Sequence, residues 1–258
     1  MAQFAPHYNL FKIITTLRNI SSFVFWIIFG IALLPDILIK INLQLDLKTI
    51  LATANISLMI AFFVIDVLID ILVPMADTKR RDDFLDNSLG CMLSSQSSIG
   101  YYDNDEVSIG FYKVAVNLYQ NCFTTFSLVK QITIKRTLLP IFVLVIIIIM
   151  AYRGFQESTF AITTLQVLFS ATVLGTVIKH VILLVKLSSI ESYWIGLFSD
   201  PTFKTNTDSF KHKILKNWFA YETLHSKIPA EIPKTTYDKW NPILTAEWLQ
   251  IKVRYNIN

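Results

Sequence analysis

The sequence predicts a mainly α-helical membrane protein with four transmembrane helices, a cytosolic helical insert between spans two and three, and a cytosolic C-terminal tail. Of its 258 residues, 53% are hydrophobic and only 16% are charged, and the mean hydropathy is +0.49. Soluble domains usually carry about a quarter charged residues. The apolar residues also gather in long uncharged runs, which have the length that a bilayer requires.

The four spans follow from these runs, and the charges between them set the boundaries. We expect spans at 20–41, 49–74, 137–152 and 160–178. Pro35 is expected to kink the end of the first span, whereas Pro140 lies in a first helical turn, where proline is tolerated. The predicted regions are spans one and two with the N-terminal segment (1–76), the insert (77–137), spans three and four (138–196), and the tail (197–258).

Basic residues predict the orientation. Lys79, Arg80 and Arg81 directly follow the second span, Lys135 and Arg136 precede the third, and Lys179 follows the fourth. By the positive-inside rule these ends are cytosolic, which places both termini in the cytosol. The first apolar run leads into Pro35 and Asp36 rather than a small-residue cleavage site, so we expect no cleavable signal peptide.

The second span carries a polar stripe. Asn55, Asp66 and Asp70 fall close to one face of a helix. Ionisable residues inside a span are costly and often mark an ion or proton path, so these three are the candidate pore residues. Two other interpretations stay open: Asp70 is solvated near the membrane surface, or both acids only pair with other helices. Polar residues of the fourth span favour helix–helix contacts instead, namely Thr163, Gln166 and Ser170.

Three further helices are expected outside the membrane. One starts after a Ser108 cap at Ile109, buries residues at helical spacing and leads directly into the third span. In the tail, Asp208 is expected to cap a helix in which Phe210, Ile214, Trp218 and Phe219 face one way. Residues 227–242 are rich in proline and predict an extended segment, followed by a last helix that starts at Asn241-Pro242. Phe11, Ile14 and Leu17 could form one face of a short interfacial helix, or the N-terminus could be flexible.

The sequence contains no motif for catalysis or metal binding. It lacks the nucleophile elbow, the phosphate-binding glycine loops, CxxC pairs and HExxH. We therefore predict no catalytic residue, no metal site and no enzyme activity. Cys91 and Cys122 are far apart and on the predicted cytosolic side, where thiols stay reduced.

The insert and the tail combine basic and aromatic residues. Between residues 197 and 258 there are nine Lys and Arg against six Asp and Glu, with interleaved tryptophan and tyrosine. Bases stack on aromatic rings while lysines hold phosphates, so a nucleotide is a candidate ligand. A solvated lysine-rich face is the plainer alternative. The candidate ligand-binding residues are Tyr101, Tyr102, Lys113, Lys211, Lys213 and Lys216.

Three segments carry a family resemblance: KRRDDFLDNSLG after span two, then GYYDNDE, then VAVNLYQNCFTTFSLVK. With the order of spans, insert and tail, they make most of the chain resemble the SMODS-associated four-transmembrane effectors of bacterial antiviral systems. The resemblance implies a bacterial inner-membrane protein and a partner nucleotidyltransferase whose product, single-stranded DNA or another nucleotide signal, is the ligand. It also implies that the effector permeabilises the membrane and stops the infected cell.

These observations lead to one main hypothesis and two rivals. Four helices are too few to enclose a wide pore, so a channel requires a homo-oligomer, such as a tetramer, with the polar second span along its axis. The first rival is a non-conducting scaffold that anchors a cytosolic partner. The second, a small proton-coupled transporter, fits less well because the chain shows no internal repeat.

Overall fold

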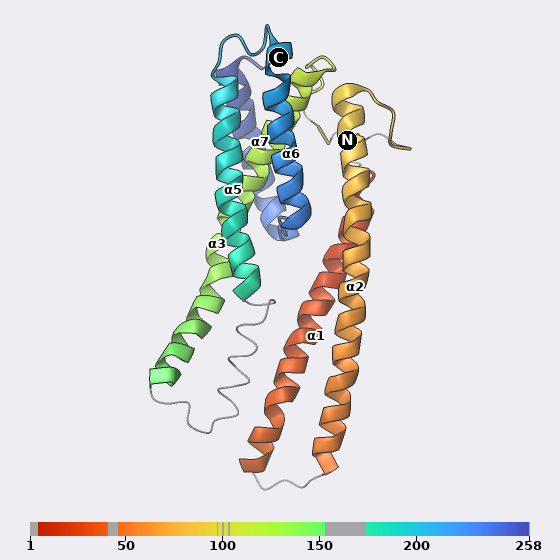
Figure 1. Ribbon diagram of the computed structural model, residues 1–258, viewed down its shortest axis with the longest axis vertical. Coiled ribbons are helices and arrows are strands. Elements are labelled where there is room, and N and C mark those ends of the chain that lie inside the picture. Colours follow the sequence, from red (N-terminus) through yellow and green to blue (C-terminus); the bar gives the residue numbers. More distant parts are fainter. Residues whose placement is uncertain are drawn as a thin grey trace. The chain divides into compact units, whose positions relative to one another are not determined.

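The computed structural model describes residues 5–40, 46–96, 98–99, 101–102, 104–152 and 174–257. They form an all-α protein, as the sequence predicts (Figure 1). The helices are α1 (Tyr8–Lys40), α2 (Asp46–Leu89), α3 (Phe111–Tyr152), α5 (Leu174–Phe198), the 3-10 helix η1 (Thr207–Phe210), α6 (Lys211–Lys227) and α7 (Lys234–Tyr255).

The chain divides into two compact units. Unit 1 comprises Met1–Pro6, Thr78–Thr137 and Val177–Asn258, and unit 2 comprises His7–Asp77 and Leu138–Thr176. The predicted insert and tail therefore meet in one unit, whereas the first two predicted spans belong to the other. Helices α2 and α3 contribute residues to both units.

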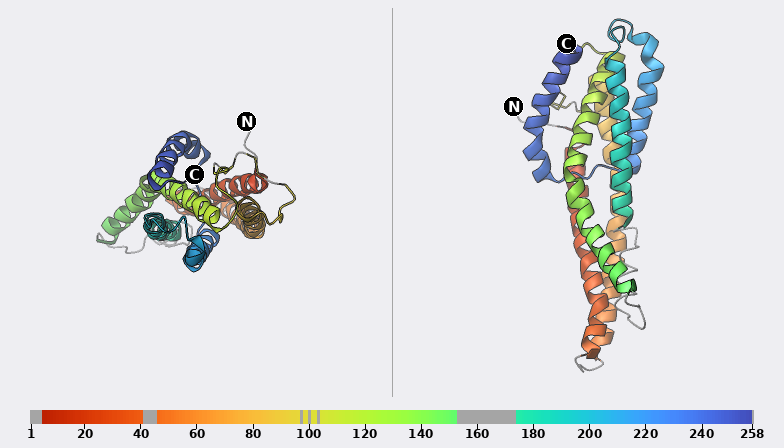
Figure 2. Two further views of the ribbon diagram at one scale, coloured as in Figure 1. Left: turned by 90° about the horizontal axis from the view of Figure 1, so that it is seen from above. Right: turned by 90° about the vertical axis from the view of Figure 1, so that its left-hand side faces the viewer.

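In unit 2, α1 lies beside the first part of α2 (Figures 1 and 2). Ile14, Ile69 and Ala76 form its small buried cluster, and the rings of Phe25 and Phe62 lie 6.1 Å apart. Ile14 belongs to a single helix that starts at Tyr8, so the separate interfacial helix expected at the N-terminus is wrong. The apolar residues simply continue the helical spacing of the first span into the N-terminal segment.

Three of the described helices are long and apolar enough to cross a membrane: Tyr8–Ala32, Thr49–Leu89 and Leu174–Phe198. The first of these covers residues 20–32 of the first predicted span, and the second contains the whole of the second predicted span. The third predicted span is the C-terminal part of α3, which is continuous from Phe111 to Tyr152 but is not one of these three helices. Most of the fourth predicted span, including Thr163, Gln166 and Ser170, lies outside the described residues.

Unit 1 is built around the first half of α3. This half lies between α7 on one side and α5 and α6 on the other (Figure 2). Helical spacing predicts its inward face correctly, since Val114, Ala115, Leu118 and Cys122 are all buried. Aromatic rings fill the contacts around it, and the ring of Tyr119 lies 5.3 Å from that of Trp248 on α7.

Several buried polar side chains in unit 1 form hydrogen bonds with one another. The side-chain amide of Asn104 donates to Asn117 Oδ1 at 2.8 Å, and the amide of Asn117 donates to Asn87 Oδ1 at 2.9 Å. The indole N–H of Trp248 donates to Asn104 Oδ1 at 3.3 Å. These bonds join α2, α3 and α7 through a loop, and they offset the cost of burying amides away from water.

Two helix starts and the exposure of one side chain differ from the sequence prediction. Helix α3 begins at Phe111 rather than Ile109, because Gly110 has a φ of 147° and donates its N–H to Ser88 O. Asp208 does not cap α6: it lies in η1 and pairs with Lys211. Phe219, expected on the inward face of α6, is exposed.

The segment before the last helix is shorter than the sequence predicts. Helix α7 starts at Lys234, not at Asn241, and contains Pro242. Pro233 supplies the extended residue before it, and its carbonyl accepts from Thr236 and Tyr237, each at 3.0 Å. An ion pair of 2.6 Å between Lys234 and Asp238 supports the first turn. The extended part of the predicted segment is therefore confined to residues before Lys234, and Pro242 lies within the helix.

Candidate functional sites

The first candidate site is the polar stripe of α2 in unit 2. Asp66 and Asp70 are exposed beside buried Ile69, so they lie at the edge of the face that packs within unit 2. Asn55 is half-buried, and its Oδ1 accepts no hydrogen bond from the described residues. The structure thus leaves both carboxylates exposed, whereas the amide oxygen of Asn55 is buried without a hydrogen bond among the described residues.

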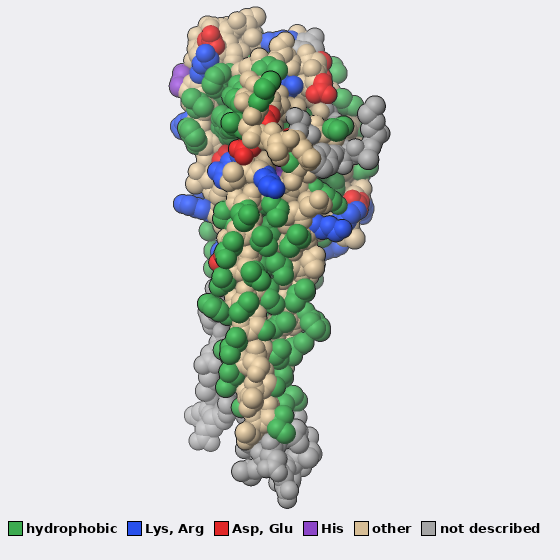
Figure 3. All heavy atoms as spheres, turned by 90° about the vertical axis from the view of Figure 1, so that its right-hand side faces the viewer, with side chains coloured by type: hydrophobic (Ala, Val, Ile, Leu, Met, Phe, Trp, Pro, Cys, Tyr) green, Lys and Arg blue, Asp and Glu red, His purple; other side chains and the backbone are tan. Residues whose placement is uncertain are grey.

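The surroundings of the stripe are strongly apolar. On the face that Figure 3 presents, hydrophobic side chains lie along the length of the helices of unit 2. On α2 the exposed large apolar side chains are Ile50, Ile56, Met59, Ile60, Phe63, Val64, Val67, Leu68, Ile71 and Met75. Such a surface is stable in lipid, whereas ionised carboxylates within lipid need water or a partner.

Two of the predicted ligand residues belong to an aromatic group in unit 1. Tyr102 is buried, and its ring lies 6.3 Å from that of Phe84 and 4.9 Å from that of Tyr101. Phe84 in turn lies 5.4 Å from Trp218 on α6. Tyr102 therefore acts as a core residue, and the exposed Tyr101 is the one of the pair that a ligand can reach.

A third predicted ligand residue, Lys113, is only 6% exposed and takes part in a charge cluster. Burial would raise the pKa of Glu106, but a hydrogen bond from Lys252 and the charges of Lys252 and Lys113 hold that pKa below its usual value. Lys113 thus serves the internal charge balance of unit 1. A ligand would have to open this cluster to reach it.

The three remaining predicted residues lie together on α6 or at its start. Lys211 pairs with Asp208 at 2.8 Å, and its ammonium lies 5.2 Å from the ring centre of Phe111. Lys213 and Lys216 are exposed, and Lys213 lies 5.0 Å from the ring centre of Phe210. The predicted ligand set therefore falls into three surroundings, of which only the α6 group is basic and open.

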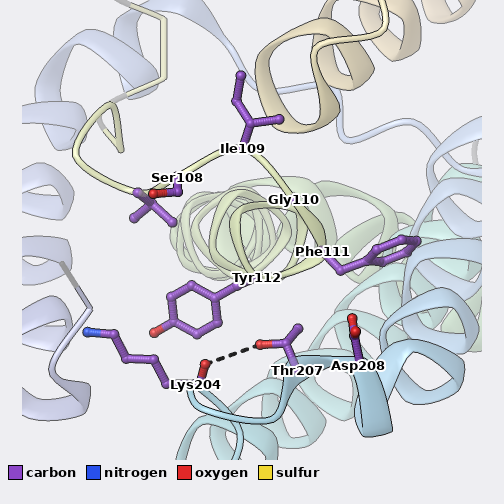
Figure 4. A pocket seen from close by; sticks show the side chains of 9 residues that line it. Ser108, Ile109, Gly110, Phe111, Tyr112, Lys204, Thr207 and Asp208 are labelled. Carbon is purple, nitrogen blue, oxygen red and sulfur yellow. Dashed lines mark hydrogen bonds between the residues drawn. The ribbon is translucent and has the colours of Figure 1, made fainter.

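A pocket of about 330 Å³ lies beside this group (Figure 4). Its walls are the start of α3 and the segment before α6, with Tyr112, Lys204, Thr207 and Asp208 among its lining residues. A helix start and a lysine favour an anion, but the only lysine among the described residues that line the pocket, Lys204, donates to Asn256 O at 2.9 Å, and Asp208 brings negative charge. The pocket is thus less basic than its lysine suggests.

Sequence reasoning missed a buried charged contact in unit 1. Arg80 on α2 and Glu222 on α6 form a bidentate pair, with distances of 2.5 Å and 3.3 Å, and both residues are buried. The sequence signal was Arg80 itself, which was interpreted only as a marker of membrane orientation. Glu222 stands alone in the tail sequence, so nothing there pointed to the pair.

The fold and these sites define a class of protein: an all-α protein with helices that can cross a membrane, joined to a unit with its own apolar core. No group of His, Cys, Asp and Glu that could hold a metal occurs among the described residues. No family model, curated protein or solved structure gives a significant match to this chain.

Proposed function

We propose that this protein is an oligomeric ion channel of the bacterial inner membrane, gated by a nucleotide or single-stranded DNA oligomer bound to unit 1. The observation that carries the proposal is the surface of α2, where Asp66 and Asp70 are exposed among apolar side chains. Lipid suits the apolar residues but not two carboxylates. Copies that assemble around water satisfy both, with Asn55, Asp66 and Asp70 lining the pore.

The resemblance to SMODS-associated effectors supplies the setting of this proposal. A partner nucleotidyltransferase makes the ligand, and channel activity during phage infection arrests or kills the cell. Within that family the chain resembles the channel effector of the Hailong defence system. That likeness implies a ligand that holds the channel shut, whereas a ligand that opens it fits the residues equally well.

The ligand surface of the proposal is the exposed face of α6. Lys213, Lys216 and Lys227 lie along this face, with Phe219 exposed beside them. The lysines offer charge to successive phosphates, and the ring offers a platform for a base. Lys211, next to the pocket, and Tyr101 complete the set.

The pore is tested by current across planar bilayers that contain the purified protein. Asp66→Leu and Asp70→Leu should reduce the conductance or change the cation selectivity, because each removes a charge from the water-filled axis. Val67→Leu, an exposed apolar position one residue away from Asp66, serves as the control. Unchanged currents from both aspartate variants would remove the stripe from the mechanism.

The ligand surface is tested with a labelled single-stranded DNA oligomer. The double variant Lys213→Glu/Lys216→Glu should weaken binding strongly, and binding by the unmodified protein should fall as salt rises. Lys130→Glu, at an exposed lysine of α3, is the matched control. Equal binding by all three proteins would exclude α6 as the ligand surface.

A non-conducting scaffold is the alternative, and one feature of unit 1 favours it. The loop after α2 exposes apolar side chains, with Met92 exposed to 92% and Leu93 and Ile109 also exposed. The carboxylate of Asp86 fixes this loop by accepting from the N–H groups of Leu93 and Ser94. An ordered apolar loop is typical of a protein-binding surface. Bilayers that never conduct, with or without DNA, would favour this function.

A further inference from the structure

Helix α7 has two apolar faces, and only one of them is used within unit 1. Leu244 and Trp248 are buried in the core. On the side away from them, Pro242, Ala246, Leu249 and Val253 are exposed, with Leu249 exposed to 53% and Val253 to 83%. These four residues are called the α7 strip below. A helix at the surface normally has a polar outer face, so the strip needs a partner.

The spacing of the strip indicates what kind of partner covers it. Its residues follow one another at intervals of four, three and four, which is the repeat that brings two helices together along a seam. Ala246 lies within the strip, and a small side chain there lets a second helix approach closely. The occupant is therefore a helix.

The charges around the strip indicate which helix it is. The four strip residues carry no charge, and neither do Ile243, Thr245 and Gln250 beside them. Next to the strip in the sequence, the charged residues are Glu247 after Ala246 and Lys252 and Arg254 on either side of Val253, and Lys252 pairs with Glu106. A pairing between identical helices sets like charges against each other, so an uncharged seam suits a second copy of α7. Recognition of a different protein would more often use complementary charge.

The size of the strip also favours a second copy. A stable interface between free proteins usually involves about 20–30 residues on each side, far more than this strip offers. It can hold only a partner that is already kept nearby. A copy anchored in the same bilayer has this advantage, because confinement raises its effective concentration.

We propose that the α7 strip is a self-association surface, on which α7 of a second copy packs. This inference rests on the proposed homo-oligomer in the membrane, and it names the surface of unit 1 through which two copies meet. In an isologous pair the same strip is contributed by both chains, which is the commonest way for identical subunits to pair.

Cysteine crosslinking of the full chain in its membrane tests the surface. In a Cys91→Ser background, which removes the exposed native thiol, Ala246→Cys, Leu249→Cys and Val253→Cys are introduced singly. Treatment with a short bismaleimide should give crosslinked dimers several-fold more often than for Glu247→Cys. That control is exposed on the same helix but outside the strip. Equal or absent crosslinking at all four positions would overturn the proposal. If another protein covers the strip, no dimer of this chain is crosslinked there, and the proposal is overturned in the same way.

Because a crosslink can also trap a chance encounter between two copies, a second measurement tests whether the strip stabilises the assembly. The double variant Leu249→Lys/Val253→Lys should shift the particle mass in detergent toward smaller assemblies, because like charges then face each other, while Glu247→Lys should not. Unchanged assembly would contradict the proposal. If α7 pairs but bilayers with the protein carry no current, the proposed channel function is wrong and this inference stands. If bilayers carry current but α7 does not pair, this inference is wrong and the channel function stands.

Discussion

Unit 1 buries many apolar side chains in its own core, whereas unit 2 leaves many of its apolar side chains exposed. The core cluster of unit 1 contains 25 buried residues from five helices and the loops between them, many of them aromatic, whereas the buried cluster described in unit 2 contains three. The apolar side chains that unit 2 does not bury are exposed, as those of α2 show. Unit 1 is thus stabilised by burial within the chain, and unit 2 depends on what surrounds it.

The comparison also explains why α5 differs from the other apolar helices. By length and composition α5 can cross a membrane, as α1 and α2 can. Yet Leu183, Leu187 and Trp194 of α5 are buried in the core of unit 1. Composition alone therefore does not separate a helix that faces lipid from one that faces a protein core, but burial does.

The largest expected effect is in the core of unit 1. Trp248→Ala should lower the free energy of unfolding by about 3–5 kcal/mol, because it leaves a large cavity and removes the donor to Asn104 Oδ1. Denaturant unfolding of the protein in micelles, followed by tryptophan fluorescence, measures it. Val253→Ala on the same helix should change stability by only about 0.5 kcal/mol or less. Similar losses for both variants would mean that unit 1 is not held by this core.

A slightly smaller loss is expected from the buried ion pair. Arg80→Ala should cost about 3 kcal/mol, because the carboxylate of Glu222 is then buried without its partner. The double variant Arg80→Met/Glu222→Leu should recover most of that loss, since it leaves no buried charge. If the double variant is as unstable as Arg80→Ala, packing around Arg80 rather than the charge accounts for the effect.

Two aspartates near the end of α2 should respond to pH in opposite directions. Burial raises the pKa of Asp83, and nearby Asp86 adds to this, against hydrogen bonds from Ser98. For Asp86, burial would also raise the pKa, but hydrogen bonds from Ser94 and the N–H of Leu93 together lower it. Folding therefore disfavours ionisation of Asp83 and favours ionisation of Asp86.

The signs follow from proton linkage. Folded Asp83 binds its proton more tightly than unfolded Asp83, so its contribution to stability rises as pH falls toward about 3.8 and is lost as pH rises. The contribution of Asp86 is present above about 3.8 and is lost below it. At pH 7, Asp83→Asn should stabilise the protein, and Asp86→Asn should destabilise it by about 1 kcal/mol. Shifts of the same sign in thermal melts at pH 7 would contradict this assignment.

The sequence predicted the parts of the fold that depend on local periodicity. The helical spacing of Val114, Leu118 and Cys122 identified the inward face of α3, and the apolar runs identified α1 and α2. The errors are at helix starts. Ser108 and Asp208 both had the chemistry of a cap, but the φ of Gly110 and the 3-10 turn at η1 moved the starts of α3 and α6.

The candidate sites were less predictable because they depend on contacts between distant residues. Composition indicated that Lys113 and Lys213 were equivalent, yet the first is buried beside Glu106 and the second is exposed. The pair of Arg80 and Glu222 joins residues 142 positions apart. No periodicity in a single sequence encodes such a contact, whereas the stripe of Asn55, Asp66 and Asp70 lies on one helix and could be predicted from spacing alone.

The smallest expected effect on stability is at the exposed face of α2 in unit 2. It tests most directly whether unit 1 depends on its own core and unit 2 on the lipid around it. Ile60 on α2 is exposed, whereas Ile214 on α6 is fully buried. Ile214→Ala should cost about 2–5 kcal/mol, while Ile60→Ala should change stability in micelles by about 0.5 kcal/mol or less, because detergent replaces the lost contacts. Both losses are measured by thermal melting under identical conditions. A loss for Ile60→Ala as large as that for Ile214→Ala would mean that protein, not lipid, covers this face of α2.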